Sequence, residues 1–212
     1  MTSCSKDSDN ETIVDITKNV RGTYVDERDG NVYNYITIGG LDWMTDNCKY
    51  DLGDDELRAV YETQQIPGDY GVTTNAETIE KYGYLYSFSG AQQAAPEGWR
   101  VPTDEDWKSL EIALGMTKEE ADGDEWRGNG VATIMNSETG MNMVYGGFID
   151  LNSTSWASKS YFINAAGMYW TSTSPAEGLG YMRKILYKSN QVYRHTTKTN
   201  NKLSVRFVRD AE

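Results

Sequence analysis

Two short acidic clusters are the residues of this sequence that could bind a metal. They lie at residues 54–56 and 122–125. Carboxylate oxygens on a turn are the ligands that Ca²⁺ prefers, and Asp122 and Asp124 form the better-placed pair. Their spacing does not match an EF-hand loop, and a solvated acidic surface is the usual role of such runs. We therefore expect no cofactor, with calcium at this pair as the minor alternative.

Groups for covalent or histidine-dependent catalysis are scarce. The chain holds one histidine, His195, and two cysteines, Cys4 and Cys48. This count argues against Cys/His zinc sites and most histidine-dependent hydrolases. Cys48 is expected to be a small buried hydrophobic residue. A carboxylate-dependent hydrolase stays open on composition, since two acids suffice for glycoside hydrolysis, but no acid pair stands out. We expect a protein that is not an enzyme.

Flat side chains and a basic segment are better candidates for ligand binding. Trp126, Trp156 and Tyr161 lie among polar residues, and such rings can stack on a sugar, although a loop tryptophan more often packs its own loop. Residues 181–212 carry eight Lys and Arg against two acids, which could bind an anionic partner such as a charged glycan. Arg194 and His195 are the candidates there. The alternative is that these charges protect strand edges and pair with the acidic body.

A cysteine near the start of the chain suggests a lipid anchor. Thr2-Ser3-Cys4 resembles the end of a bacterial lipoprotein signal, in which small residues precede the cysteine that is lipidated. The polar, acidic residues that follow are similar to those after the lipidated cysteine of surface-exported lipoproteins. We expect residues 1–21 to be a flexible tether that holds a surface-exposed domain on the bacterial outer membrane. The alternative is a disordered start with a chance cysteine.

Composition limits the partners further. Lys and Arg number 20 and Asp and Glu 32, which gives a net charge of −12 and a pI of about 4.6. Nucleic-acid binding would need a local basic patch that opposes this charge. No run approaches the roughly 18 apolar residues of a membrane-spanning helix, so membrane contact is expected only through Cys4.

The elements that must position these residues are mainly strands. Runs at 23–26 and 32–38 flank Asp29-Gly30, a tight hairpin signal, and residues 41–44 predict a third strand. The last third predicts an antiparallel sheet with strands at residues 169–173, 181–186, 191–195 and 203–208.

Helix signals are fewer. Residues 104–114 predict a helix with Thr103 as its N-cap and Trp107 on the buried face, and Thr117 with Glu120 forms a capping box for a short second helix. Residues 91–95 are compatible with a short helix before Pro96. The stretches 51–74 and 122–168 predict a surface loop and a long irregular region.

Seven ordered segments carry a resemblance to a known bacterial family. They are residues 29–33, 38–47, 82–86, 98–107, 146–148, 169–173 and 204–208. Together they closely resemble the Fibrobacter succinogenes major paralogous domain family, over about residues 22–210. The Arg100-Val101-Pro102-Thr103 block is also similar to formylglycine-generating enzymes, whose cysteine pair is missing here. This likeness implies a single α+β domain over residues 22–212, C-type-lectin-like, with antiparallel sheets, about two helices and a long irregular loop region.

The sequence departs from that family at one informative pair of positions. Members often carry a cysteine where this chain has Ala95 and another where it has Phe207. Because both are absent together, we expect apolar side chains to fill the site in place of a disulfide. Both thiols of the chain are expected to be free when Cys4 is not lipidated.

Two functions follow as expectations. The first is a non-catalytic surface lipoprotein whose loop region binds an extracellular glycan or protein. The second is a structural or accessory subunit of an adhesive surface filament, in which the same loops contact neighbouring subunits. The family resemblance implies the bacterial envelope as the setting and supplies no settled activity.

Overall fold

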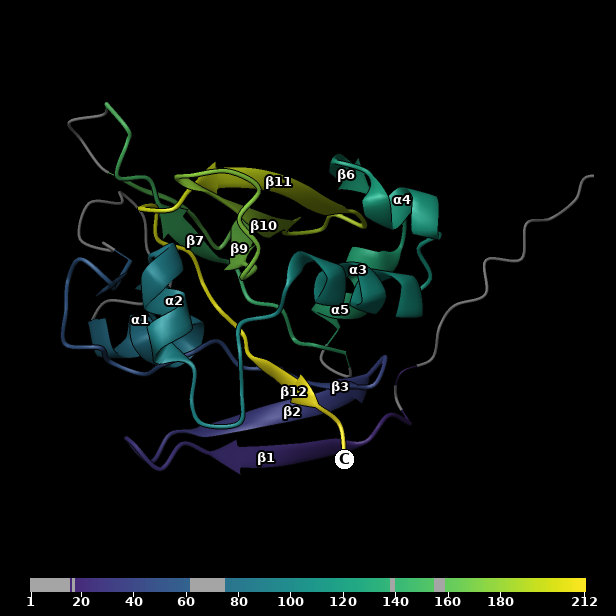
Figure 1. Cartoon of the computed structure of the whole chain (residues 1–212), viewed down its shortest axis with the longest axis horizontal. Coiled ribbons are helices and arrows are strands. Elements are labelled where there is room, and N and C mark those ends of the chain that lie inside the picture. Colours follow the sequence, from purple (N-terminus) through teal and green to yellow (C-terminus); the bar gives the residue numbers. More distant parts are fainter. Residues whose placement is uncertain (1–15, 17, 62–74, 138–139, 155–158) are drawn as a thin grey trace, which may run out of the picture.

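The computed structural model describes residues 16, 18–61, 75–137, 140–154 and 159–212. Within these ranges the chain forms three sheets and five helices. The six-stranded sheet lies at the top of Figure 1 and the four-stranded sheet at the bottom, with helices between them. No helix in these ranges is long and apolar enough to span a bilayer.

The four-stranded sheet confirms the three predicted N-terminal strands. Its order is β1 (Arg21–Val25), β2 (Val32–Ile38), β3 (Leu41–Met44) and β12 (Val208–Asp210), and every neighbour is antiparallel. Gly30 has a φ of 79°, the left-handed conformation that the Asp29-Gly30 turn requires. The strand expected at 203–208 is wrong in its bounds, because β12 shares only Val208 with it and residues 203 and 204 make isolated bridges to Tyr86 and Tyr169.

The six-stranded sheet is built mainly from the second half of the chain. In spatial order its strands are β6 (Glu125–Arg127), β11 (Val192–Lys198), β10 (Leu179–Leu186), β9 (Ala166–Trp170), β7 (Gly146–Ile149) and β8 (Ser160–Ile163). All pairs are antiparallel except β7 with β9. A third sheet pairs β4 (Arg58–Ala59) with β5 (Leu85–Tyr86).

The expected fold class is wrong in its number of helices and in its balance of helix and strand. The chain is a mostly β structure with α1 (Asn75–Tyr82), α2 (Phe88–Ala94), α3 (Asp104–Ala113), α4 (Lys118–Asp122) and α5 (Val131–Asn136), five helices in the described ranges where about two were expected. The helix α5 escaped prediction because it has six residues and no side-chain cap at Gly130. A helix this short depends on tertiary packing rather than on local signals.

The long irregular region expected at 122–168 is also wrong. It contains β6, α5, β7, β8 and the start of β9. These strands have three to five residues, too few to show a clear alternation of polar and apolar side chains. Pairing makes them strands: β6 pairs with β11, β9 with β10, and β7 with β8 and β9.

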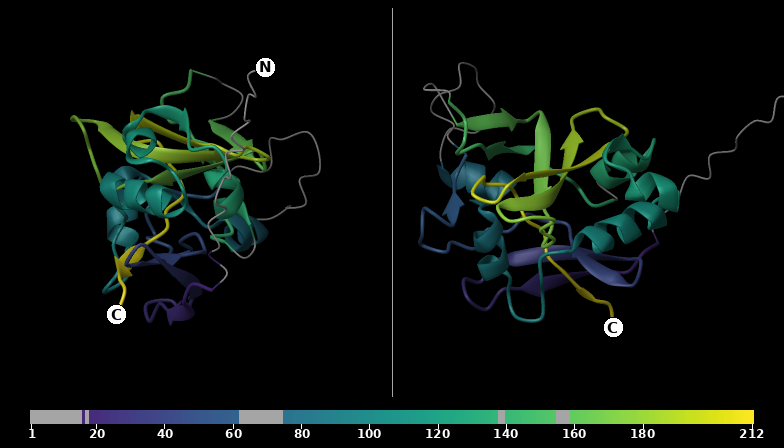
Figure 2. Two further views of the ribbon diagram at one scale, coloured as in Figure 1. Left: turned by 90° about the vertical axis from the view of Figure 1, so that its right-hand side faces the viewer. Right: turned by 45° about the horizontal axis from the view of Figure 1, so that its top comes forward.

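A layer of aromatic side chains joins the two large sheets. Trp107 of α3 lies between Trp43 of β3 and Tyr169 of β9, with ring centroids 5.1 Å and 6.2 Å apart. All three side chains are fully buried, which confirms the prediction for Trp107. The two further views in Figure 2 show α3 lying between the sheets.

A second buried cluster occupies the place of the missing disulfide. It contains Phe207 and Cys48, and Ala95 packs against it. Cys48 is a free thiol, and burial raises its pKa to about 11. Apolar volume therefore fills this part of the core, as expected. Cys4 lies outside the described residues.

The N-cap of α3 provides a first test. The Thr103 hydroxyl accepts from the amide of Asp106, and the Asp106 carboxylate accepts from the amide of Thr103. Thr103→Ala should lower the free energy of unfolding by about 1 kcal/mol, measured by chemical denaturation. Thr103→Ser keeps the hydroxyl and should stay near the parent value, so equal losses in both variants would contradict the capping role.

Candidate functional site

One row of side chains crosses all six strands of the large sheet. We call it the aromatic row, and its members in spatial order are Trp126, Tyr193, Lys184, Met168, Phe148 and Tyr161. Direct register pairs join the first four members and the last two. Between Met168 and Phe148 the strands β9 and β7 diverge: Gly147 pairs with Gly167, but Tyr169 bridges to Ser204 and Ile149 bridges to Lys202. Met168 is only 5% exposed, so the row presents two separate ends at the surface.

The row lies on the face of the sheet that points away from α3. Successive side chains of a strand point to opposite faces, and Arg183 and Arg194, which flank the row, bond to acids of α3. Tyr193 and Phe148 instead pack against the second cluster, which includes Met168. At a neighbouring level on this face, Phe88 of α2 covers Trp170 at 5.4 Å.

One end of the row combines two rings with a cation. The rings of Trp126 and Tyr193 have centroids 4.9 Å apart, and Trp126 is 36% exposed. The Lys184 ammonium lies 4.2 Å from the Tyr193 centroid and 5.3 Å from that of Trp126. Burial lowers the pKa of Lys184. His195 continues the same face of β11, is exposed, and stands 5.7 Å from the Tyr193 ring.

The other end gathers three rings. Phe148 lies 5.7 Å from Tyr161 and stacks on Phe162 at 6.1 Å. Phe162 has a φ of 67°, which breaks the alternation of β8, so that two consecutive rings reach the same neighbour. This conformation is costly for a bulky residue, and Phe162 is nevertheless 56% exposed. The backbone therefore holds an apolar ring at the surface.

The structure places the predicted binding residues in two groups. Trp126, Tyr161 and His195 lie on the face that carries the aromatic row, although they come from strands far apart in sequence. Arg194 points to the opposite face. Trp156 lies outside the described residues. Tyr193, Lys184, Phe148 and Phe162 were not singled out from the sequence, since only the strand register brings them together.

The two predicted metal ligands are engaged in ion pairs. Asp122 lies 2.9 Å from the Lys108 ammonium, which lowers the pKa of Asp122, and Asp124 pairs with Arg194. Among the residues that the structure describes, no three His, Cys, Asp or Glu side chains are grouped as a metal site would need.

Beneath the row, a buried ion cluster fixes the sheet on α3. Asp104 accepts from Arg183 and Arg194, and Glu111 accepts from Arg183 and Arg127, all at 2.6 to 2.7 Å in their shortest contacts. Burial acts to raise the pKa of Asp104, but the hydrogen bonds and charges of its two arginines outweigh it, so the net pKa is lowered. Glu111 and Arg183 are fully buried. This cluster was not predicted from the sequence. The pair of acids seven residues apart on either side of Trp107 is the signal that could have indicated it.

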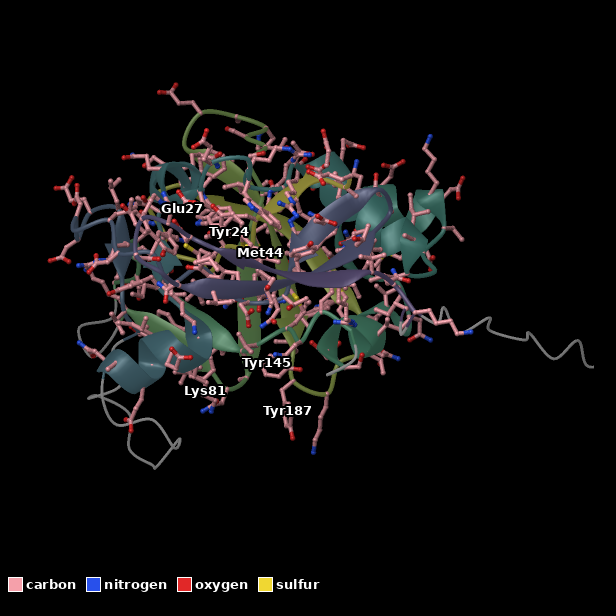
Figure 3. The ribbon with its side chains drawn as sticks, turned by 90° about the horizontal axis from the view of Figure 1, so that it is seen from below. Tyr24, Glu27, Met44, Lys81, Tyr145 and Tyr187 are labelled. Carbon is pink, nitrogen blue, oxygen red and sulfur yellow. The ribbon has the colours of Figure 1, made fainter. Side chains whose placement is uncertain are left out.

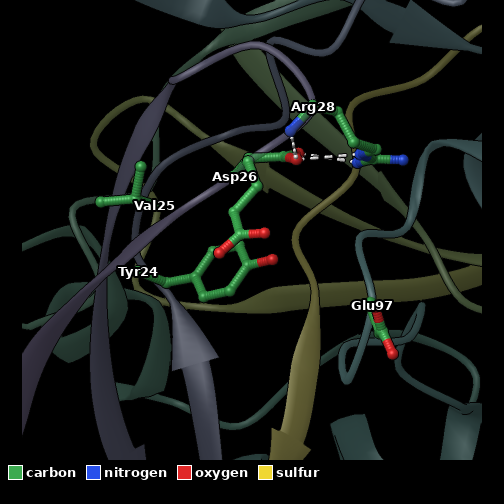
Figure 4. A pocket seen from close by; sticks show the side chains of 6 residues that line it. Tyr24, Val25, Asp26, Arg28 and Glu97 are labelled. Atoms are coloured by element: carbon green, nitrogen blue, oxygen red, sulfur yellow. Dashed lines mark hydrogen bonds and ion pairs between the residues drawn. The ribbon is translucent and has the colours of Figure 1, made fainter.

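A surface hollow on the other large sheet is a weaker candidate. It has a volume of about 470 Å³ and is lined by residues 24–28 and Glu97 (Figure 4). Figure 3 shows Tyr24 and Glu27 on this side of the molecule. Asp26 already accepts hydrogen bonds from the Arg28 amide and guanidinium, which outweigh the effect of burial and lower its pKa. Asp26 and Arg28 therefore satisfy each other.

Removing one charge from the ion cluster should destabilise the domain. Glu111→Gln leaves two buried guanidinium groups with one fewer counter-charge, and we expect a loss of about 3 kcal/mol in the free energy of unfolding by urea denaturation. Asp124→Asn is the matched control, because the Asp124 side chain is 63% exposed and such pairs contribute under about 1 kcal/mol. Similar losses in both variants would contradict a dominant role for the buried carboxylate.

Comparison with known proteins gives a match to one family and no match to a solved structure. No curated protein and no solved structure matches this chain significantly, so the expected C-type-lectin-like fold gains no support from a relative. Residues 36–209 match the sequence model of one family, described as the Fibrobacter succinogenes major domain. The match includes every member of the aromatic row and every residue of the ion cluster. The chain therefore belongs to the Fibrobacter succinogenes major domain family.

Proposed function

We propose that this protein is a non-catalytic binding domain of the bacterial surface. In this proposal a lipid on Cys4 anchors it to the outer membrane, and the aromatic row binds an extracellular glycan or protein. The row is the observation that carries the proposal.

Exposed rings at the two ends of the row are costly unless they serve contact. Tyr and Trp offer an apolar face and a polar tip, which suits surfaces that are wet in one state and covered in another. Trp126 at one end is 36% exposed, and Phe162, which stacks on Phe148 of the row at the other end, is 56% exposed in an unfavourable backbone conformation. Strained residues that persist at a surface support a functional role.

The position of β1 favours an orientation in which the aromatic row faces away from the membrane. The first described strand, β1, belongs to the four-stranded sheet, on the opposite side of the molecule from β10 and β11 (Figure 1). A tether that enters at β1 would leave the six-stranded sheet on the side away from the membrane. The row would then face the surroundings of the cell.

A second candidate function is assembly into a surface filament. The strand β1 is an edge of its sheet, and Val20, Val25 and Val32 nearby are each more than half exposed. An open edge with apolar side chains can pair with a strand of another chain. Glycan arrays run alongside pull-down from envelope extract separate the two functions, because assembly would yield neighbouring subunits and no glycan.

Loss of Trp126 should weaken binding far more than stability. For any ligand that these screens identify, Trp126→Ala should cost about 2 kcal/mol of binding energy by calorimetry, since central aromatic contacts dominate interfaces. Its stability loss should stay near 1 kcal/mol, the scale of one cross-strand pair. Tyr187→Ala is the control, because Tyr187 is exposed beside Tyr145 and outside the row (Figure 3). Unchanged affinity in Trp126→Ala would place the site elsewhere.

Anchoring is tested separately in the native bacterium. The parent chain should fractionate with the membrane and carry an acylated Cys4 peptide in mass spectrometry, whereas Cys4→Ala should be released. Ser5→Ala alters the same segment without removing the thiol and should stay membrane-bound. A Cys4→Ala chain that still fractionated with the membrane would contradict lipidation.

A further inference from the structure

We infer that the ligand of the aromatic row is an acidic glycan, whose carboxylate or sulfate is bound by Lys184 while its sugar rings stack on the flanking aromatic rings. This inference rests on the proposed function and narrows its ligand to one chemical class.

Lys184 is a partly buried lysine whose ammonium faces two aromatic rings. In the part of the chain that the structure describes, no carboxylate lies within ion-pair distance of its ammonium. The neighbouring cations are committed elsewhere, since Arg183 and Arg194 bind acids of α3 and Lys108 binds Asp122. Among the described residues, its ammonium contacts the faces of Tyr193 and Trp126.

Partial burial makes this lysine receptive to an anion. Burial lowers its pKa because the charged form loses part of its hydration without gaining a counter-charge. A carboxylate or sulfate brought to the ammonium would supply that charge and form a charge-assisted hydrogen bond. The protein carries a net charge of −12, so an anion needs a local cation such as Lys184 in order to bind.

The rings beside Lys184 indicate a glycan rather than another anion. The ring centroids of Tyr193 and Trp126 lie 4.2 Å and 5.3 Å from its ammonium, and the two rings contact each other. An acidic oligosaccharide can therefore place its charged sugar over Lys184 and a neighbouring sugar over these two rings. Single-stranded nucleic acid also stacks on aromatic side chains, but it needs a positively charged groove along its backbone. One free lysine on an acidic chain does not provide that groove.

The experiment compares acidic polymers with neutral forms of the same backbone. Polygalacturonate, alginate and hyaluronan would be titrated by calorimetry into the full folded chain, each beside its methyl-esterified form. We expect at least one acidic polymer to bind, its ester to bind about tenfold more weakly or worse, and affinity to fall as salt is raised.

Matched charge variants locate the effect. Lys184→Gln should weaken binding of the acidic polymer about tenfold and leave the weak binding of the ester unchanged. Lys198→Gln removes the same charge from an exposed position on the neighbouring strand β11 and should bind as the parent does. Melting temperatures of both variants confirm that each is folded.

Three results would overturn the inference. Equal binding of the acidic polymer and its ester, or equal affinity of Lys184→Gln and the parent, would show that the ligand's negative charge is not recognised. The proposed binding function would remain intact. Absence of binding to every acidic polymer, together with a protein ligand whose affinity depends on Trp126, has the same consequence. If neither glycan nor protein ligands depend on Trp126, the proposed function of the row fails as well.

Discussion

Two carboxylates on a single helix determine how this domain is assembled. Asp104 and Glu111 lie two turns apart on α3 and hold three arginines from β6, β10 and β11. Burying a charge without a partner costs several kcal/mol, so a placement of this sheet that separates the acids from the arginines is strongly disfavoured.

The same constraint sets the composition of the opposite face. Side chains alternate along a strand, so fixing Arg183 and Arg194 toward α3 turns Lys184 and Tyr193 to the other side. A slip of one residue would bury Lys184 against Glu111 and expose an arginine. The same strand register therefore places the ion cluster on one face of the sheet and the aromatic row on the other. The row depends on charges that it does not contact.

The row also joins two parts of the chain that looked like separate candidates. Trp126, Phe148 and Tyr161 come from the stretch that lacks clear patterning, and Lys184 and Tyr193 come from the basic C-terminal strands. The short strands β6, β7 and β8 attach at the two sides of β9 to β11 and carry rings to both ends. At one of these ends, the result is a cation beside two aromatic rings.

The sequence alone determined the elements whose signals are local. The Asp29-Gly30 hairpin, the capped helix at 104–113 and the longer strands follow from turn, cap and periodicity rules that act within about ten residues. Residue type alone also made Trp126, Tyr161 and His195 binding candidates. Only the tertiary structure decided that these three share a face, that Arg194 does not, and that β6, α5, β7 and β8 exist. Such short elements form because long-range partners satisfy their backbone and bury their side chains, and no local pattern records those partners.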